Sequence, residues 1–521
     1  MLKRIFAKYS VWHPLIIGTL LRFLHLGGRS FWNDEGLTAY IVNRPLPEAL
    51  HYIAEYTMDG YLYYLVLLFW GKLVGVTEFS LGFISAVAGI VTIYFAYRLL
   101  KIVASEKEAY ICAFITALVP FMVYASNEVR PYSAFLGMTS VLTAYFFLRA
   151  LQEDKIRYWI LTTVFTVLNG YVHLLGWSLG LTMFFFILLS PQYRKWNYLW
   201  KTAVVLFIAV LIYLPQLIVA YQQLSQYGTF DGTTRSGQQL GFIRVLLLAV
   251  KQFLGGTYRL MTGYYFMDLG GAGFTKFSLA NLALFIVTLL TGLGIPLAAA
   301  LSLLKKKSPW ILFFALMFLT AFIQVFWEGV DPRRLTPPAA ALYALIALAY
   351  FDWKRSLRII FISLFLISTV FSLGKMYSLT SSIARQEDFR RISEIITAER
   401  APGDIVLYYG GPASACAWEF YDPGNTIITP SDSHLSPDIY FRPSLGFIFD
   451  HSNFTTGIDS LLPLHTQVWL LFANYPKEEI KSGIASFQTL YGLDLVFEDG
   501  YNLLYKLKNP AAENSPSNDN P

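Results

Sequence analysis

The chain has 521 residues, of which 55% are hydrophobic and only 14% are charged. Because soluble domains carry about 25% charged residues, this composition excludes an ordinary soluble enzyme and indicates that lipid surrounds much of the chain. The formal net charge of +6 is spread over short connections between apolar tracts, which favours a role in membrane orientation and predicts no nucleic-acid partner.

Apolar tracts as long as a membrane-spanning helix, which needs about 20 residues, recur along the chain. The first follows a basic start without a small-residue cleavage site, so we expect a retained helix and not a cleaved signal peptide. A short additional tract, 61–76, contains Lys72 and either spans the membrane or lies in the interface. We therefore expect a polytopic helical protein with about 11–13 spans. Eleven of the tracts lie at 11–27, 80–99, 109–126, 131–149, 158–173, 174–190, 202–220, 276–303, 310–327, 335–351 and 358–374.

Basic residues gather in alternate connections, and this pattern sets the predicted orientation. If 61–76 does not span, these connections share one side, which the positive-inside rule places in the cytoplasm. If 61–76 spanned, every later loop would change sides and the rule would fail repeatedly. We therefore predict a multi-pass protein of the cell (inner) membrane with a cytoplasmic N-terminus, and place 45–57 and 61–76 as interfacial helices in an outer loop, 28–79.

Three regions follow from this reading. Residues 1–374 are predicted to form the membrane domain, with a second long outer loop at 221–275. Residues 375–508 are predicted to form a small α/β domain on the extracytoplasmic (periplasmic) face, and 509–521 a disordered tail. The strands of the 375–508 domain are expected in DIVLYYG, QVWLLFA, LDLVFED and YNLLYKL, and its amphipathic helices in DFRRISEIITAER and PKEEIKSGIASFQTL.

Two cysteines, Cys112 and Cys416, lie in an apolar and a polar stretch respectively. We expect neither a disulfide nor a metal–thiolate site from them. The sequence also lacks a Walker A motif, a GxGxxG after a strand, an HExxH motif and Cys/His metal spacing. The sequence therefore gives no sign of nucleotide binding or of a zinc centre.

The acidic pair Asp34–Glu35 in FWNDEGLTAY directly follows the first predicted helix. A carboxylate placed there can act as a general base on a hydroxyl or an amine. The alternative is a solvated acidic turn that caps the next helix, because Asn33 and Asp34 are favoured N-cap types.

A second polar motif, SNEVRPYSAF, joins two predicted spans and contains Glu128, Arg130 and Tyr132. Glu128 is a second acidic group on the predicted outer side, and Arg130 could orient it or meet a phosphate. The alternative is a local ion pair at a helix junction. His173, in NGYVHLLGW, is either a substrate-binding group or a hydrogen-bonded core residue.

Arg333 and Arg334 in EGVDPRRLTPP lie on the predicted outer side, against the positive-inside rule. A guanidinium fork matches the geometry of a phosphate, so the pair could grip an anionic headgroup; the alternative is helix-end anchoring. The long loop 221–275 could form a lid, and its reactive members are Asp231, Arg235, Tyr258 and Arg259.

Taken in order, FWNDEGLTAYIV, DGYLYYLVLLFWGKLVG, PFMVYASNEVRPYSAFL and GYVHLLG resemble the GT-C membrane glycosyltransferases. The bacterial relatives of protein O-mannosyltransferases and of the lipid A aminoarabinose transferase (glycosyltransferase 39/83-like) are the most similar. The resemblance covers about residues 10–190 and continues more weakly over 310–352. The chain departs from the family at 58–61, where it reads Met-Asp-Gly-Tyr in place of His-Pro-Pro, and at 127–130, where Asn-Glu-Val-Arg replaces Gln-Glu-Ala-Arg.

The resemblance implies an inverting hexosyl- or pentosyltransferase that takes its sugar from a polyprenyl phosphate on the outer face. The acceptor would be a glycolipid, a polysaccharide or a protein of the envelope. By position, Asp34 would be the base, with Glu35 as the substitute, and Arg334, Arg333 and Arg130 would stabilise the leaving phosphate. The resemblance assigns no cofactor and leaves a divalent cation open.

Two other hypotheses come from different classes. A transporter or flippase of lipid-linked glycans would place its polar site near the bilayer midplane on broken helices, whereas the ionisable residues here gather at predicted outer helix ends. A catalytically inactive scaffold for glycan assembly is the third hypothesis.

Overall fold

The computed structural model divides into two compact units, each described separately below. The membrane unit comprises Met1–Leu26, Pro45–Gly75 and Phe79–Tyr377, and the C-terminal unit comprises Gly27–Arg44, Val76–Glu78 and Ser378–Pro521. The structure describes residues 8–56, 60–227, 242–263, 279–322, 334–377, 387–401, 404–410, 412–422, 427–428, 467–473, 492–499 and 502–507.

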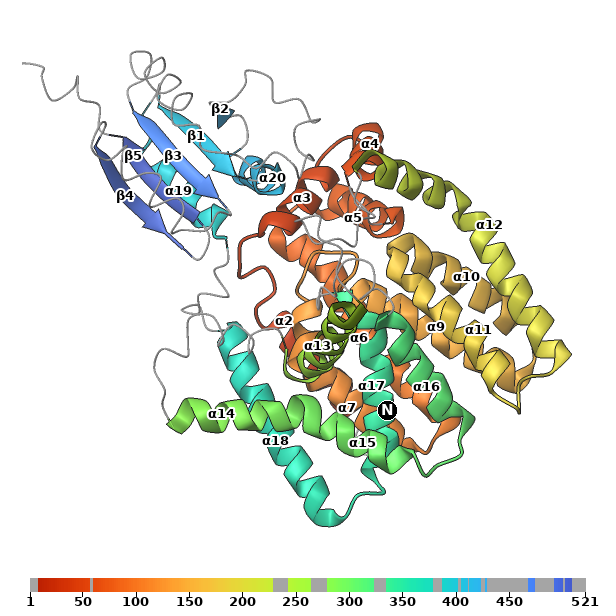
Figure 1. Ribbon diagram of the computed structural model, residues 1–521. Helices are drawn as coiled ribbons and strands as arrows, with labels where there is room; N and C mark the ends of the chain where they lie inside the picture. The colour runs from red at the N-terminus through yellow and green to blue at the C-terminus, as the bar shows by residue number, and fades with distance from the viewer. Residues whose placement is uncertain are drawn as a thin grey trace, which may run out of the picture. The chain divides into compact units, whose positions relative to one another are not determined.

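Helices dominate the described parts of the membrane unit, and each of the eleven predicted tracts contains helix (Figure 1). Apolar side chains suit these helices to a lipid environment. Helices also suit lipid because their backbone groups form hydrogen bonds within the segment. The segments are α2 (Trp12–Phe23), α6 (Glu78–Val103), α7 (Glu106–Leu118), α8 (Pro120–Ala125), α9 (Ala134–Glu153), α10 (Ile156–Val172), η1 (Leu174–Trp177), α11 (Ser178–Leu189), α12 (Trp196–Tyr227), α14 (Leu279–Leu289), η3 (Leu290–Gly294), α15 (Ile295–Leu303), α16 (Pro309–Thr320), α17 (Thr336–Tyr350) and α18 (Arg355–Tyr377).

Five helices within the described residues are long and apolar enough to cross a membrane, judged by length and composition. Other predicted tracts are interrupted by local breaks. Val119, between α7 and α8, takes an extended ψ of 127° because Pro120 disfavours helical backbone in the residue before it. His173, between α10 and η1, is extended as well, with φ −165° and ψ 148°.

The predicted interfacial tracts form α4 (Leu46–Tyr56) and α5 (Tyr61–Val74). At 1.5 Å per residue, the 14 residues of α5 span about 21 Å, which is less than the roughly 30 Å hydrocarbon core. Because α17, a predicted span, is about as short at 15 residues, the interfacial position of α5 stays a prediction.

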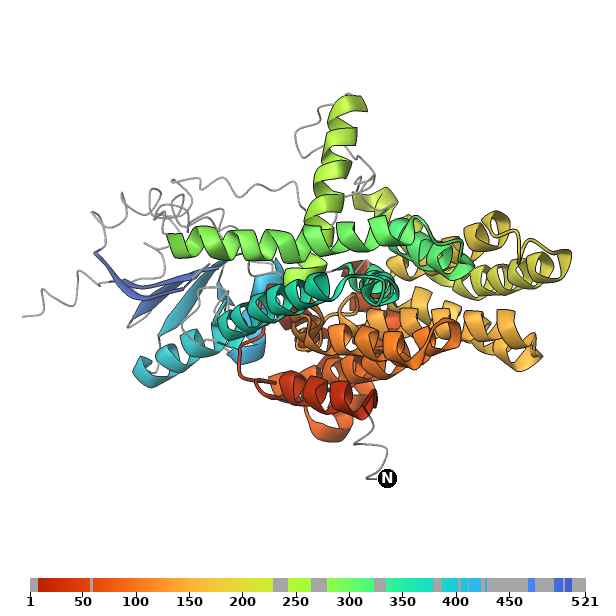
Figure 2. The same ribbon diagram turned by 90° about the horizontal axis from the view of Figure 1, so that it is seen from below.

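The segment predicted as the outer loop 221–275 contains helix α13 (Phe242–Thr262). Its end packs on other helices, since the Tyr343 hydroxyl donates to the Leu260 carbonyl at 2.7 Å, and Tyr258 lies against Gly292 of η3. Figure 2 shows α14, η3 and α15 as one continuous rod. Tyr258 is thus part of the packed core and not of a mobile lid.

A buried arginine ties the first helix to the break between α7 and α8. Arg22 donates to the carbonyls of Ala117 and Thr116 at 3.1 and 3.2 Å and to the Ser126 hydroxyl at 2.9 Å. The last carbonyls of a helix have no partner within it, so the Arg22 guanidinium satisfies the end of α7. This contact fixes the start of the segment that carries Glu128.

The C-terminal unit contains a mixed five-stranded sheet of strand order β2-β1-β3-β5-β4. Strands β1 and β3 run parallel, whereas β5 is antiparallel to both β3 and β4. The four predicted strands are confirmed as β1 (Ile405–Gly410), β3 (Val468–Ala473), β4 (Leu493–Glu498) and β5 (Asn502–Leu507), and β2 (Ile427–Ile428) is added.

Two described helices pack on this sheet. The predicted helix after 388 is confirmed as α19 (Phe389–Glu399), while the one over 476–490 lies outside the described residues. The other is α20 (Pro412–Tyr421), which the sequence analysis did not predict. Buried Trp418 and Trp469 lie in the shared core.

Helix α3 (Asn33–Val42), which carries the acidic pair, belongs to the C-terminal unit and packs on α20. A Cβ placed on Gly36 would lie only 2.1 Å from Ala417 Cβ, so a glycine is needed for the two helices to approach this closely. A segment separated from the C-terminal region by more than 300 residues is thereby built into that region's fold.

Candidate functional site

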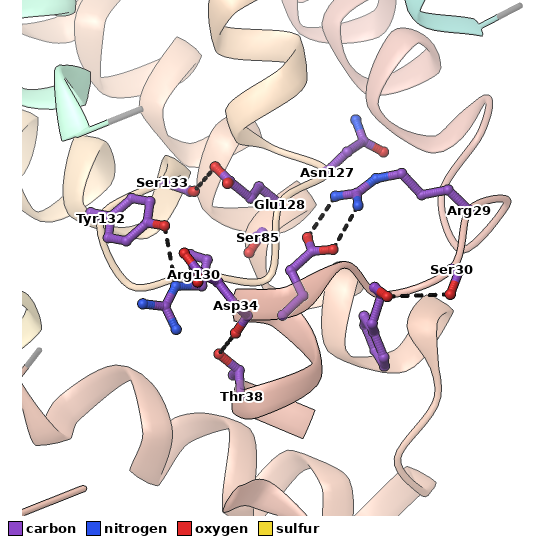
Figure 3. A network of polar contacts seen from close by, with 12 residues as sticks. Arg29, Ser30, Asp34, Thr38, Ser85, Asn127, Glu128, Arg130, Tyr132 and Ser133 are labelled. Atoms are coloured by element: carbon purple, nitrogen blue, oxygen red, sulfur yellow. Dashed lines mark hydrogen bonds and ion pairs between the residues drawn. The ribbon is translucent and has the colours of Figure 1, made fainter. Parts of the chain in front are cut away.

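The acidic pair occupies the first turn of α3. Trp32 precedes the helix with extended backbone, and the peptide N–H groups of the first turn favour the negative charges of Asp34 and Glu35. The Thr38 hydroxyl donates to the Asp34 carbonyl at 3.1 Å and strengthens this turn (Figure 3). The sequence prediction that the pair begins a helix is therefore compatible with either of its two alternative roles.

The two carboxylates have different surroundings. Glu35 is 1% exposed, and Arg29 holds it through Nη1–Oε2 and Nη2–Oε1 contacts of 2.6 and 2.5 Å. Asp34 is half-buried. Both oxygens of the buried Glu35 carboxylate therefore accept hydrogen bonds from Arg29, whereas Asp34 is partly exposed, and the assignment of a base role to either acid stays a prediction.

In the membrane unit, Arg130 lies against Tyr132. Its Nε donates to the Tyr132 hydroxyl at 3.2 Å (Figure 3), and its Nη1 donates to the Tyr64 hydroxyl at 3.4 Å. The Arg130 guanidinium carbon is 5.1 Å from the centroid of the Tyr132 ring, which is within the range of a cation–π contact.

Two other predicted residues converge on the same tyrosine. The Arg334 guanidinium carbon is 5.6 Å from the Tyr132 ring centroid, and the His173 ring meets Tyr132 edge-on at 6.0 Å. The Thr336 hydroxyl donates to the Tyr132 carbonyl at 2.8 Å and holds the backbone in place. Three separate stretches of sequence thus meet at one ring, whereas Arg333 lies outside the described residues.

Glu128 is fully buried, with 0% exposure. The Ser133 hydroxyl donates to its Oε2 at 2.6 Å (Figure 3). This bond closes the loop between α8 and α9. The contact therefore stabilises the turn that presents Arg130 and Tyr132, and a role of Glu128 toward a substrate stays a prediction.

His173 lies at the turn between α10 and η1. The Leu175 N–H donates to its Nδ1 at 3.1 Å, so the neutral ring carries its proton on Nε2. Asn169 supports the same turn: Thr139 and Ser140 donate to its Oδ1, and its Nδ2 donates to the Gly176 carbonyl at 2.9 Å.

Gly60, the third residue of the departure from the family pattern at 58–61, lies beside this turn, while residues 58 and 59 lie outside the described residues. The Gly60 N–H donates to the Val172 carbonyl at 3.1 Å, and a Cβ on Gly60 would lie 1.9 Å from the Tyr171 carbonyl oxygen. Only glycine fits at this position, where the start of α5 and the end of α10 approach each other. Gly60 therefore fixes the distance between the start of α5 and the His173 turn.

The sequence analysis missed Arg29, Tyr64 and Asn169. Arg29 lies six residues before the carboxylate it binds, in a Gly-Gly-Arg-Ser turn, and Tyr64 lies inside a segment that carried the resemblance. A polar residue inside an apolar tract was the available signal for Asn169. Asp231 and Arg235 of the predicted lid lie outside the described residues.

The question of a metal ion was left open by the sequence. Within the part of the chain that the structure describes, no three His, Cys, Asp or Glu residues form a group that could hold a metal ion. A divalent cation therefore stays an open possibility of the sequence analysis, and the chemistry below is written with side chains of the described residues.

Comparisons with known proteins agree with this architecture. The family model for dolichyl-phosphate-mannose-protein mannosyltransferase matches residues 58–219. The crystal structure of ArnT from Cupriavidus metallidurans in the apo state is similar at 14% identity and a TM-score of 0.60, covering 97% of this chain and 99% of that one. No curated protein sequence matches the chain.

Two further solved structures share the fold. ArnT from the same organism bound to undecaprenyl phosphate has 13% identity, covers 97% of this chain and 99% of that one, and gives a TM-score of 0.56. The archaeal oligosaccharyltransferase AglB from Archaeoglobus fulgidus, in complex with an inhibitory peptide and a dolichol-phosphate, has 15% identity, covers 98% and 74%, and gives 0.51. The predicted GT-C fold, with its multi-pass membrane region and small C-terminal α/β domain, is confirmed.

Proposed function

We propose that this protein is an inverting glycosyltransferase that moves a sugar from a polyprenyl-phosphate donor to a glycolipid, polysaccharide or protein acceptor at the extracytoplasmic face. The observation that carries the proposal is the convergence of Arg130 and Arg334 on Tyr132. Two guanidinium groups near one ring bring two positive charges into the same region, and an anion that contacts both would be attracted by each.

A phosphate is the anion that suits this arrangement. Guanidinium groups bind phosphate oxygens through paired N–H donors. The Tyr132 and Tyr64 hydroxyls accept from Arg130, and each also carries an O–H that can donate to an anion. In a glycosyl transfer from a lipid phosphate, negative charge grows on the leaving phosphate, so donors aimed at it lower the barrier. The undecaprenyl phosphate and dolichol-phosphate in two structures of the same fold support a lipid-phosphate donor.

Asp34 serves as the base in the proposed step. The acceptor hydroxyl oxygen or amine nitrogen attacks the anomeric carbon and gives its proton to the Asp34 carboxylate. The bond from the anomeric carbon to the phosphate oxygen breaks, and its electron pair stays on the phosphate. The products are the glycosylated acceptor, with inverted configuration, and the free polyprenyl phosphate.

The test is a transfer assay with the purified full chain in lipid nanodiscs, radiolabelled polyprenyl-phosphate sugars and extracted envelope acceptors. We expect transfer by the wild type and a loss of about 10²-fold or more in Asp34→Asn, which removes general-base catalysis. Glu35→Gln should retain more activity than Asp34→Asn.

The matched control is Asp352→Asn. Asp352 is an exposed acid paired with Lys306 in the connection between α17 and α18, and its loss should leave transfer unchanged. Full transfer by Asp34→Asn would refute the assigned mechanism. Movement of the donor between leaflets without any glycosylated product would instead favour the flippase hypothesis.

A further inference from the structure

The backbone that leads into Asp34 is hydrogen-bonded by side chains from the far end of the chain. The Phe31 N–H donates to the Tyr421 hydroxyl at 2.7 Å, and the Asn33 N–H donates to Glu387 Oε2 at 2.5 Å. Both acceptors belong to the C-terminal unit, as does Asp34 itself. The N–H groups on either side of Trp32 are therefore held by tertiary contacts.

The second of these bonds supplies a cap that the sequence around α3 lacks. Trp32 occupies the N-cap position without a side-chain hydrogen bond to the helix, and tryptophan has no acceptor oxygen to make one. The first N–H groups of a helix have no intrahelical partner. Glu387 satisfies the N–H of Asn33, the first residue of α3.

Arg390 adds a second set of contacts to the same segment. Its backbone N–H donates to the Ser30 hydroxyl at 3.3 Å, and its Nη2 donates to the Gly28 carbonyl at 3.1 Å. Its Nη1 reaches Glu78 Oε1 at 3.3 Å, the same oxygen to which the Tyr421 hydroxyl donates at 2.8 Å. The Tyr421 hydroxyl thus acts both as an acceptor, from the Phe31 N–H, and as a donor, to Glu78.

The far end of α3 is held to α20 as well. Arg44 pairs with Glu419 at 2.8 Å, and Gly36 lies in direct contact with Ala417. With Glu387 and Tyr421 at the beginning of the helix, α3 is attached at both ends. The position of the α3 backbone that carries Asp34 is consequently held by residues 387–421 of the C-terminal unit.

Glu387 has the surroundings of a neutral acid. It is 6% exposed, and burial, together with the nearby carboxylates of Asp34, Asp499 and Glu35, raises its pKa to about 8, against the opposing effect of the Asn33 N–H. A carboxylic acid accepts the Asn33 bond without placing another negative charge beside Asp34. A glutamine amide oxygen could accept the same bond.

We propose that Glu387 and Tyr421 are positioning residues for the Asp34 base, acting through the backbone N–H groups of Asn33 and Phe31. The proposal rests on the base role that the proposed function assigns to Asp34. Loss of a capping acceptor destabilises the first turn of a helix, and a displacement of about 1 Å in a reacting group can cost roughly 10²-fold in rate.

The experiment combines steady-state kinetics with hydrogen exchange of the full chain in nanodiscs. We expect Glu387→Ala to lower kcat by about tenfold to a hundredfold with KM unchanged, and to speed exchange of the amides of residues 31–36 by about tenfold. Glu387→Gln should restore both, since it keeps the acceptor. Tyr421→Phe keeps the ring and should accelerate exchange at Phe31 with a smaller loss of kcat.

The matched control is Glu394→Ala on α19, the helix that begins two residues after Glu387. The exposed Glu394 pairs only with neighbouring Arg391 in the contacts that the structure describes for it, so kcat and exchange should not change. Exchange in strands β1 and β3 is the internal standard, and uniform acceleration there would overturn a local positioning role. Normal kcat in Glu387→Ala, alongside an inactive Asp34→Asn, would overturn this inference while the proposed function stands. If the wild type transfers no sugar, the exchange data decide: unchanged protection of 31–36 in Glu387→Ala overturns the inference, and faster exchange supports it.

Discussion

Arg29 grips the Glu35 carboxylate with both ends of its guanidinium group, at N–O distances of 2.6 and 2.5 Å, while Glu35 is almost completely buried. This ion pair gives two acids that are adjacent in sequence, Asp34 and Glu35, different surroundings. Glu35 is committed to a structural ion pair, and Asp34 retains access to solvent.

Breaking the Arg29–Glu35 pair from one side should be worse than removing it altogether. Arg29→Ala leaves a buried carboxylate without its cation and should destabilise the C-terminal unit by about 3 kcal/mol. The double variant Arg29→Ala/Glu35→Ala should be more stable than Arg29→Ala alone. A double-mutant cycle of thermal unfolding measures this difference, and strictly additive losses would contradict the prediction.

The two arginines at Tyr132 should contribute to donor binding and to the rate. Arg130→Ala and Arg334→Ala should each lower kcat/KM for the lipid-phosphate sugar by about 10–10³-fold, because each removes charge that stabilises the leaving phosphate. Arg334→Lys should recover only part of the loss, since lysine lacks the planar fork.

Arg358→Ala is the matched control for these arginines. Arg358 lies 6.0 Å from the Tyr350 ring centroid in the same kind of aromatic contact, but outside the proposed site. Its replacement should leave kcat/KM for the donor unchanged. A loss in Arg358→Ala equal to that in Arg334→Ala would show that the effect is not specific to phosphate binding.

Gly60 should tolerate no side chain. Gly60→Ala places a methyl group 1.9 Å from the Tyr171 carbonyl oxygen, so the α5 start and the His173 turn must separate, with a stability loss of about 1–3 kcal/mol. Gly255→Ala serves as the control, because a Cβ at Gly255 meets nothing within 4 Å. Equal melting temperatures for Gly60→Ala and wild type would refute this packing argument.

The pH dependence of stability should report on Glu387. Its folded-state pKa of about 8 exceeds the ordinary value of 4.5, so the folded protein binds the extra proton between these values. The contribution of Glu387 to stability is complete below pH 4.5 and is lost as pH rises toward 8. The charged groups that face it are Asp34, Glu35 and Asp499, with Arg29 compensating Glu35.

Thermal unfolding between pH 5 and pH 8.5, measured on wild type and Glu387→Gln, tests this sign. The melting temperature of the C-terminal unit should fall with pH in the wild type and fall less in Glu387→Gln. Glu394→Gln, which changes an exposed acid, should follow the wild type. Identical slopes for all three proteins would contradict the assigned protonation of Glu387.

Patterns that depend on local chemistry were readable from the sequence. Apolar tracts predicted the helices of the membrane unit, alternating and β-branched runs predicted β1, β3, β4 and β5, and ordered motifs predicted the GT-C fold. The hydrophobic period of a helix or a strand, and the length of a membrane span, depend on consecutive residues only. The acidic pair at the start of α3 and the polar motif at 127–132 were candidates for chemistry because each lies at the end of an apolar tract.

The tertiary structure alone decided which of these groups share surroundings. The sequence ranked Asp34 before Glu35 by position and family resemblance, and only the fold showed that Arg29 binds Glu35. Sequence assigned the outer loop and the C-terminal region to different domains, and only the fold packed α3 on α20 and joined Asn33 to Glu387, 354 positions away. Contacts at such separations depend on how whole helices pack, because burial, charge pairing and hydrogen bonding act through space, and no spacing along the chain records them.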